Sequence, residues 1–172
     1  MPKLTEIKAH CSNPQQIASI LEEAGATFKG IDHQIDTYFM TERGRLKLRE
    51  GNIENTLIHY IRPNQAGPKN SKVTLYKPQN AAALKAVLLE AYDLKVVVDK
   101  KRGIYFIDNV KFHIDEVKGL GSFVEIEAID DAETMEEAVL LKQCKHYINL
   151  LGIQAKDLLE VSYSDMLLEK GK

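Results

Sequence analysis

Apolar and polar residues alternate along eight segments of the chain, and this alternation is typical of β-strands that bury one face. Eight strands can close into a barrel or tunnel. Turn-forming residues at 108–109 and 118–121 separate the last three segments, so we expect these three strands to form an antiparallel meander. The eight segments span residues 4–11, 34–39, 45–50, 55–62, 72–77, 95–107, 110–117 and 122–129.

Three other segments have apolar residues at helical spacing. One begins at Asn13 and Pro14, which favour a helix N-terminus, and the others span about residues 80–92 and 134–151. Each has one apolar face, so we expect each helix to lie against the sheet. The segment IRPNQAGPKNS, with two prolines and one glycine, is expected to be the most flexible loop.

Several of the expected strands carry charge on one face. Arg45, Lys47 and Arg49, for example, alternate with leucines. For a single strand, the usual explanation is a solvated face opposite an apolar core. The three amphipathic helices favour another arrangement, because they need apolar surface and the outer faces of the strands would supply it. The charged faces would then line the interior, with Lys8, Arg45, Lys47, Arg49, Arg62, Lys100 and Arg102 beside Glu6, Asp115, Glu125 and Glu127.

Such an interior must bind something ionic, because buried charges are tolerated only when they are paired or bind a metal. A guanidinium group can donate two parallel hydrogen bonds to two oxygens of a phosphate. Carboxylates are hard oxygen ligands that suit Mg²⁺ or Mn²⁺. A complex of a polyphosphate with a divalent metal would satisfy both sets of charges.

Composition narrows the class of protein. The 172 residues suit a single domain over residues 1–172, and 44% apolar with 28% charged residues excludes a disordered or fibrous chain. The net charge of -2 gives no general attraction for nucleic acid. No apolar stretch is long enough to cross a membrane and the start MPKLTEIK lacks a signal-peptide core, so we expect a cytoplasmic protein without a membrane partner. Cys11 and Cys144 are expected to be reduced and packed.

An ordered set of segments resembles the CYTH superfamily, the triphosphate tunnel metalloenzymes, and within it the class IV adenylyl cyclase group. The resemblance implies an α+β fold, an eight-stranded antiparallel β-barrel with amphipathic helices packed outside. It also implies a triphosphate substrate held by inward Lys and Arg side chains, with divalent metal on carboxylates. The segments are TEIKAH, QIDTYF, RLKLRE, YIRP, VVVDKKR, HIDEVKGLGSFVEIE and SYSDML, in order over residues 4–168.

The same resemblance suggests roles for individual residues. Glu6 and Lys8 match the second Glu and the Lys of the family's ExExK signature, whereas Leu4 replaces its first Glu and leaves one fewer metal ligand at that end. The implied metal ligands are Glu6, Glu125 and Glu127, joined by Asp115, and with Lys8 the three glutamates form the implied catalytic set. The implied phosphate contacts are Lys8, Arg45, Lys47, Arg49, Arg62, Lys100 and Arg102. Lys72 and Lys77 lie on opposite faces of the fifth strand, so only one of them can point inward, and the sequence does not say which.

The implied activity is a metal-dependent reaction of a triphosphate, with Mg²⁺ or Mn²⁺ as cofactor. It is either cyclisation of ATP to cyclic AMP and pyrophosphate, or hydrolysis of tripolyphosphate, thiamine triphosphate or a nucleoside triphosphate. A non-catalytic binder of nucleotides or polyphosphate is the alternative, and a barrel for apolar ligands would require an apolar lining. The cyclase-like relatives also suggest a homodimer. His113 could act as an acid or base, although a hydrogen-bonding role is more common for such a histidine. A structural hydrogen-bonding role is also expected for Asp36 and Tyr38.

Overall fold

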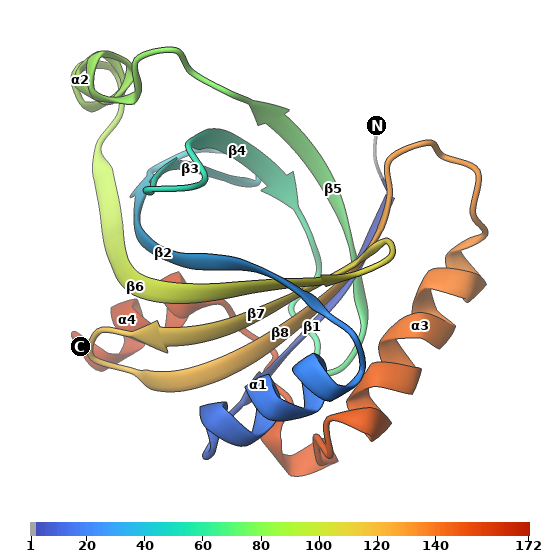
Figure 1. Cartoon of the computed structure of the whole chain (residues 1–172). Helices are drawn as coiled ribbons and strands as arrows, with labels where there is room; N and C mark the ends of the chain where they lie inside the picture. Colours follow the sequence, from blue (N-terminus) through green and yellow to red (C-terminus); the bar gives the residue numbers. More distant parts are fainter. Residues whose placement is uncertain (1–2) are drawn as a thin grey trace.

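The structure, a computed structural model, describes residues 3–172 and shows eight antiparallel strands closed into a barrel (Figure 1). Neighbouring strands follow the order β1-β5-β4-β3-β2-β6-β7-β8, and β8 pairs with β1 to close the ring. The α+β barrel expected from the sequence is confirmed, as is the meander of the last three strands. The strands are β1 Lys3–His10, β2 Thr27–Phe39, β3 Arg45–Glu50, β4 Thr56–Ile61, β5 Lys69–Tyr76, β6 Leu94–Ile107, β7 Val110–Val117 and β8 Gly121–Asp130.

The helices lie outside the barrel wall or at one of its ends. Helices α1 and α3 cover the outer face of β1, β7 and β8, α2 lies against β3, and α4 packs on β6 (Figure 1). The side chain of Asn13 caps α1 as expected, and Ser162 and Asp165 form a reciprocal capping box at the start of α4. The helices are α1 Pro14–Glu23, α2 Ala81–Ala91, α3 Glu137–Leu150 and α4 Tyr163–Lys170, with a 3₁₀ turn, η1, at Ala155–Asp157.

The main apolar core lies between the barrel wall and helices α1 and α3. Ile7, Phe112 and Ile126 point outward from their strands and pack against Leu21 of α1 and Leu140 of α3. All five side chains are buried. Because these apolar faces turn outward, the opposite faces of the same strands must line the interior.

Two strands begin three or more residues earlier than the sequence indicates. β2 was expected from residue 34 but starts at Thr27, where pairing with β6 holds a polar segment extended around a bulge at Phe28 and Gly30. β5 was expected from residue 72 but starts at Lys69, inside the loop expected to be flexible. In both cases pairing with a neighbouring strand fixes a segment whose own pattern is weak.

Three further expectations concern the extent of the domain, the state of the two cysteines and the absence of a membrane-spanning segment. The expected domain over residues 1–172 includes residues 1–2, which lie outside the described part, so its extent stays a prediction. Cys11 and Cys144 are free and buried, as expected. In the part of the chain from residue 3 onward, no helix has the length and apolar character needed to cross a bilayer.

Candidate active site inside the barrel

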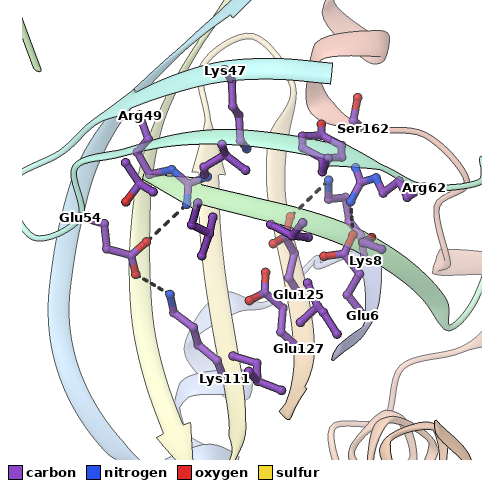
Figure 2. A pocket seen from close by; sticks show the side chains of 18 of the residues that line it. Glu6, Lys8, Lys47, Arg49, Glu54, Arg62, Lys111, Glu125, Glu127 and Ser162 are labelled. Atoms are coloured by element: carbon purple, nitrogen blue, oxygen red, sulfur yellow. Dashed lines mark hydrogen bonds and ion pairs between the residues drawn. The ribbon is translucent and has the colours of Figure 1, made fainter. Parts of the chain in front are cut away.

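A cavity of about 380 Å³ occupies the barrel interior (Figure 2). Its size is within the range of small-molecule sites. Lys47 and Arg49 of β3 point into it, whereas the intervening Leu46 and Leu48 pack outward with Leu88 of α2. The cationic face of β3 therefore lines the cavity, as the sequence predicts. The charged lining residues are Glu6, Lys8, Lys47, Arg49, Glu54, Arg62, Lys100, Arg102, Lys111, Glu125, Glu127 and Asp131.

Asp36 of β2 holds three of the cations together. Its carboxylate accepts hydrogen bonds from Lys47 Nζ at 3.0 Å, from Arg49 Nε and Nη2 at 2.9 Å each, and from Lys100 Nζ at 2.8 Å. Burial alone would raise the pKa of Asp36, but these cations hold it well below its usual value. Burial, with Arg102 and the other nearby cations, lowers the pKa of Lys100 to about 7, although Asp36 opposes this change. The hydrogen-bonding role expected for Asp36 is thus confirmed.

A second carboxylate, Glu54, links two sides of the barrel. It lies in the loop between β3 and β4 and forms ion pairs with Arg49 and with Lys111 of β7 (Figure 2). Although burial opposes ionisation, Lys111 and Arg49 lower the pKa of Glu54 to about 2. The buried carboxylate of Asp32 fixes this loop by accepting the backbone N–H groups of Ile53 at 2.8 Å and Glu54 at 3.0 Å. Glu54 could not be predicted from the pattern of strands, because a loop residue shows no alternation.

The third group of charges joins β1, β6, β7 and β8. Arg102 donates two hydrogen bonds to Asp115, at 2.7 and 2.6 Å, and its Nη2 lies 3.2 Å from Glu125. Glu125 also pairs with Lys8 at 3.2 Å. The hydroxyl of Tyr163, at the start of α4, donates to Asp115 at 2.7 Å. Burial opposes ionisation of Glu125, but Lys8 and Arg102 hold its pKa well below the usual value.

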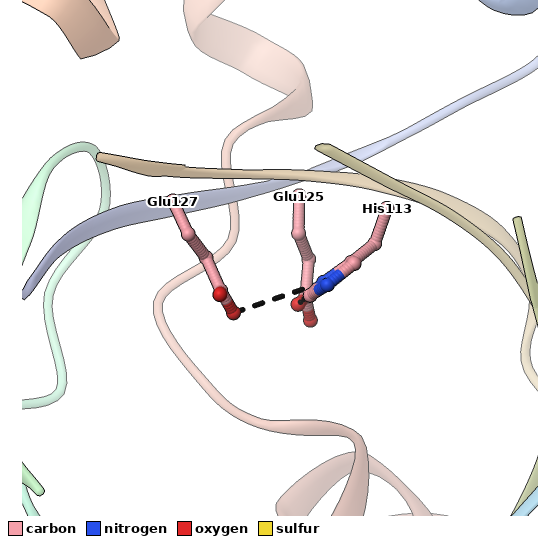
Figure 3. Close-up of side chains that lie close together, drawn as sticks. All are labelled: His113, Glu125 and Glu127. Carbon is pink, nitrogen blue, oxygen red and sulfur yellow. Dashed lines mark hydrogen bonds and ion pairs between the residues drawn. The ribbon is translucent and has the colours of Figure 1, made fainter. Parts of the chain in front are cut away.

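His113, Glu125 and Glu127 form a group that could hold a metal ion (Figure 3). One ligand atom from each lies within 4.8 Å of the other two. His113 Nδ1 is 2.9 Å from Glu125 and 3.7 Å from Glu127. Burial and the nearby Arg102 lower the pKa of His113, which favours the neutral ring that metals bind. Its Nε2 is buried without a hydrogen-bond partner in the described structure. Two carboxylates with one neutral imidazole fit Mn²⁺ well and Mg²⁺ acceptably.

The other expected metal ligands have different surroundings. Glu6 lines the cavity beside Glu127, its cross-strand neighbour, and pairs with Arg62. Both oxygens of Asp115 are engaged by Arg102 and Tyr163, and Asp115 is absent from the described cavity lining. A ligand role for Asp115 stays a prediction that would require these partners to be exchanged.

The expected phosphate contacts mostly line the cavity, with Arg45 as the exception. Arg45 pairs with Asp165 of α4 at 2.6 Å and is not among the described lining residues, so its phosphate contact stays a prediction. Neither Lys72 nor Lys77 is among the described residues that line the cavity: Lys72 alternates with the lining residues Ser71 and Val73, and Lys77 follows the end of β5. The buried cation of β5 is Lys69, whose pKa burial and the nearby Arg62 lower to about 8. Residues 69–71 are all polar, so no alternation in the sequence indicates that Lys69 lies in a strand.

The model of the CYTH domain family matches residues 3–163. The chain belongs to the CYTH domain family. A search of curated proteins found no match.

Solved structures share the fold. The PH1012 protein from Pyrococcus horikoshii OT3 is 23% identical with a TM-score of 0.82, covering 94% of this chain and 98% of that one. A proposed adenylate cyclase from Vibrio parahaemolyticus is 17% identical with a TM-score of 0.75, covering 96% and 97%. HpAC1 from Hippeastrum, a proposed adenylyl cyclase with a dominant triphosphatase activity, is 13% identical with a TM-score of 0.68, covering 100% and 97%.

Proposed function

We propose that this protein is an enzyme that binds a triphosphate with Mg²⁺ or Mn²⁺ inside the barrel and breaks a phosphoanhydride bond. Both reactions suggested by the sequence, cyclisation of ATP and hydrolysis of a triphosphate, include this step. Neighbours with the same fold carry the names of an adenylate cyclase and of a triphosphatase, which supports this class of reaction.

One observation carries the proposal. Cations from four strands, β1, β3, β6 and β7, and Arg62 just after β4 converge on a single cavity, beside a group of two carboxylates and one histidine. In Figure 2, Lys8 and Arg62 lie on the side of Ser162, the N-cap of α4, whereas Arg49 and Lys111 lie on the opposite side beside Glu54, so positive charge extends along the cavity. An extended row of cations matches a chain of phosphates better than a single anion.

The residues of the chain would act mainly by position and charge. Phosphoryl transfer needs little covalent help, because neutralising the phosphate oxygens and aligning the reacting groups supply most of the rate. Arg49 and Arg102 are pre-aligned by carboxylates, which limits the reorganisation needed when phosphate arrives. Glu125, Glu127 and His113 would hold the metal, which would supply charge neutralisation at the leaving phosphate.

The test is to incubate the protein with Mg²⁺ or Mn²⁺ and ATP, tripolyphosphate or thiamine triphosphate, and to measure cyclic AMP, pyrophosphate and free phosphate. Cyclic AMP with pyrophosphate identifies a cyclase, and free phosphate identifies a hydrolase. Glu127→Gln is the sharpest variant, because Glu127 has only a 3.7 Å contact with His113, whereas Glu125 is paired with Lys8 and Arg102. We expect turnover to fall roughly 100-fold with the fold intact. Wild-type turnover in this variant would exclude Glu127 as a metal ligand.

Leu4 favours a second function, a non-catalytic binder of nucleotides or polyphosphate. The residue lines the cavity at the position where the family signature has a Glu, so that end offers one carboxylate fewer. A binder would take up triphosphate tightly and release no product over hours in either metal. Turnover of any of the three substrates excludes this alternative.

A further inference from the structure

Apolar side chains line one end of the cavity, and the binding of phosphate and metal by the charged residues does not account for them. Leu4, Leu75, Phe106 and Ile129 line it, and we call these four residues the apolar collar. They come from β1, β5, β6 and β8. Leu4 at the start of β1 pairs with Ile129 at the end of β8 and with Ser71 of β5, whose last residues, including Leu75, extend beyond the start of β1. Phe106 lies near the end of β6, beside the start of β7, so the collar lies at one mouth of the barrel.

The apolar collar is not part of the packed core. None of its residues belongs to the three clusters of packed apolar side chains found among residues 3–172. Leu75 is 54% exposed although its side chain borders the cavity. Apolar surface that stays in contact with water is unfavourable, and when it lines a cavity it is typical of a site that covers the apolar part of a ligand.

The collar continues directly from the charged part of the site. Leu4 is the inward residue before Glu6 on β1, and Ile129 is the inward residue after Glu127 on β8. Two residues along a strand span about 6–7 Å. A group attached to a bound phosphate chain would therefore reach the collar without a long linker.

Polar groups are also present at this mouth. Ser71, the cross-strand neighbour of Leu4, lines the cavity, and its Oγ has no hydrogen-bond partner in the described structure. The carboxylate of Asp131 lines the same end. An apolar surface with a few hydrogen-bonding groups suits a flat heterocycle that carries an amino group, and it suits a bare phosphate poorly.

We propose that the apolar collar binds the organic head group of the substrate, an aromatic heterocycle, and that the site therefore selects organic triphosphates over inorganic tripolyphosphate. This inference rests on the proposed function, because it requires the phosphates to lie among the cations. The replacement of Glu by Leu4 then has two effects: it removes a carboxylate next to Glu6 and extends the surface for the head group.

The test is to measure dissociation constants by calorimetry, with Mg²⁺ present, for tripolyphosphate, a nonhydrolysable ATP analogue and thiamine triphosphate. In the wild type, we expect at least one organic triphosphate to bind about tenfold more tightly than tripolyphosphate. Leu75→Ser should weaken that binding by about three- to tenfold, the effect of losing one or two buried methylene groups, and leave tripolyphosphate unchanged. Leu94→Ser is the matched control, because Leu94 is 52% exposed and lies outside the cavity.

A second variant separates aromatic contact from apolar volume. Phe106→Leu keeps an apolar side chain but removes the ring, so it should weaken the organic triphosphate by about two- to fivefold and spare tripolyphosphate. Equal affinity for organic and inorganic triphosphates, or an equal loss for both in Leu75→Ser, would overturn the inference and leave the proposed function standing. If no triphosphate binds in either Mg²⁺ or Mn²⁺, both fail.

Discussion

Replacing Asp36 by Asn removes the carboxylate that Lys47, Arg49 and Lys100 share. The three cations contact it at 2.8 to 3.0 Å, and the side chains of Asp36, Arg49 and Lys100 are each less than a tenth exposed. The amide keeps the size of the side chain but leaves three positive groups close together without their anion. The substitution therefore tests whether the interior is held together by its own charges.

The expected cost follows from the burial of these groups. Breaking a buried ion pair costs about 3–5 kcal/mol, because the partner is left uncompensated. Deprotonation of Lys100, whose pKa is already about 7, relieves part of the repulsion, so the lower part of that range is expected at pH 8. For a chain of this length, 3 kcal/mol corresponds to a fall in melting temperature of about 6–12 °C.

The assay is urea unfolding followed by circular dichroism, with and without tripolyphosphate. Asp99→Asn is the control, because Asp99 pairs with His33 at the surface, where ion pairs contribute less than about 1 kcal/mol. Tripolyphosphate should stabilise Asp36→Asn more than the wild type, because the freed cations need an anion. Wild-type stability in Asp36→Asn, together with an unchanged response to tripolyphosphate, would refute the view that Asp36 holds the cations in place.

Three further predictions concern the protonation of Lys100, the turn at Gly51 and the contact of Tyr163 at the start of α4. Above pH 7, Lys100 binds more protons in the unfolded chain than in the folded one. Its contribution to the free energy of unfolding should therefore rise from pH 7 to 9, while the affinity for tripolyphosphate falls. Lys100→Arg should flatten both trends in unfolding and binding measurements. Gly51→Ala should lower stability by about 1–3 kcal/mol in urea unfolding, because the new Cβ would lie 2.6 Å from Asp32 Oδ1. Tyr163→Phe should cost about 1–3 kcal/mol in the same assay, because it removes a buried hydrogen bond to the Asp115 carboxylate.

Each of these has a matched control. Lys101→Arg changes an exposed lysine next to Lys100 and should keep the wild-type pH trends. Gly103→Ala places its Cβ no closer than 3.5 Å to another atom and should be tolerated better than Gly51→Ala. Tyr92→Phe changes a tyrosine that is 43% exposed and should be nearly neutral. If a control and its test variant behave alike, the contact named for that position does not carry the effect.

The orientation of the strands could be predicted from the sequence. The alternation of Arg45, Lys47 and Arg49 with leucines, combined with helices that needed apolar surface, indicated an interior lined by charge, and Lys47 and Arg49 do line the cavity. Glu125 and Glu127 were expected inside for the same reason, and they also line the cavity. The two faces of a strand follow a period of two, whatever the strand pairs with.

Other parts of the site could not be predicted in this way. Glu54 and Lys69 lie where the alternation is absent, and the cross-barrel pair of Glu54 with Lys111 joins residues 57 positions apart. The partners of Asp115 and Arg45 depend on where α4 docks, because Tyr163 and Asp165 both come from that helix. The apolar collar also appears only when the ends of four strands are brought to one mouth.

The alternation of residues is enough to predict which side of each strand is charged, because side-chain direction in a strand is a local property of the backbone. Which charges meet depends on the fold, since the order of strands and the stagger between them set the neighbours of every inward side chain. In this barrel that stagger gives Asp36 three cations, leaves His113 between two glutamates, and places apolar side chains at one mouth of the same cavity.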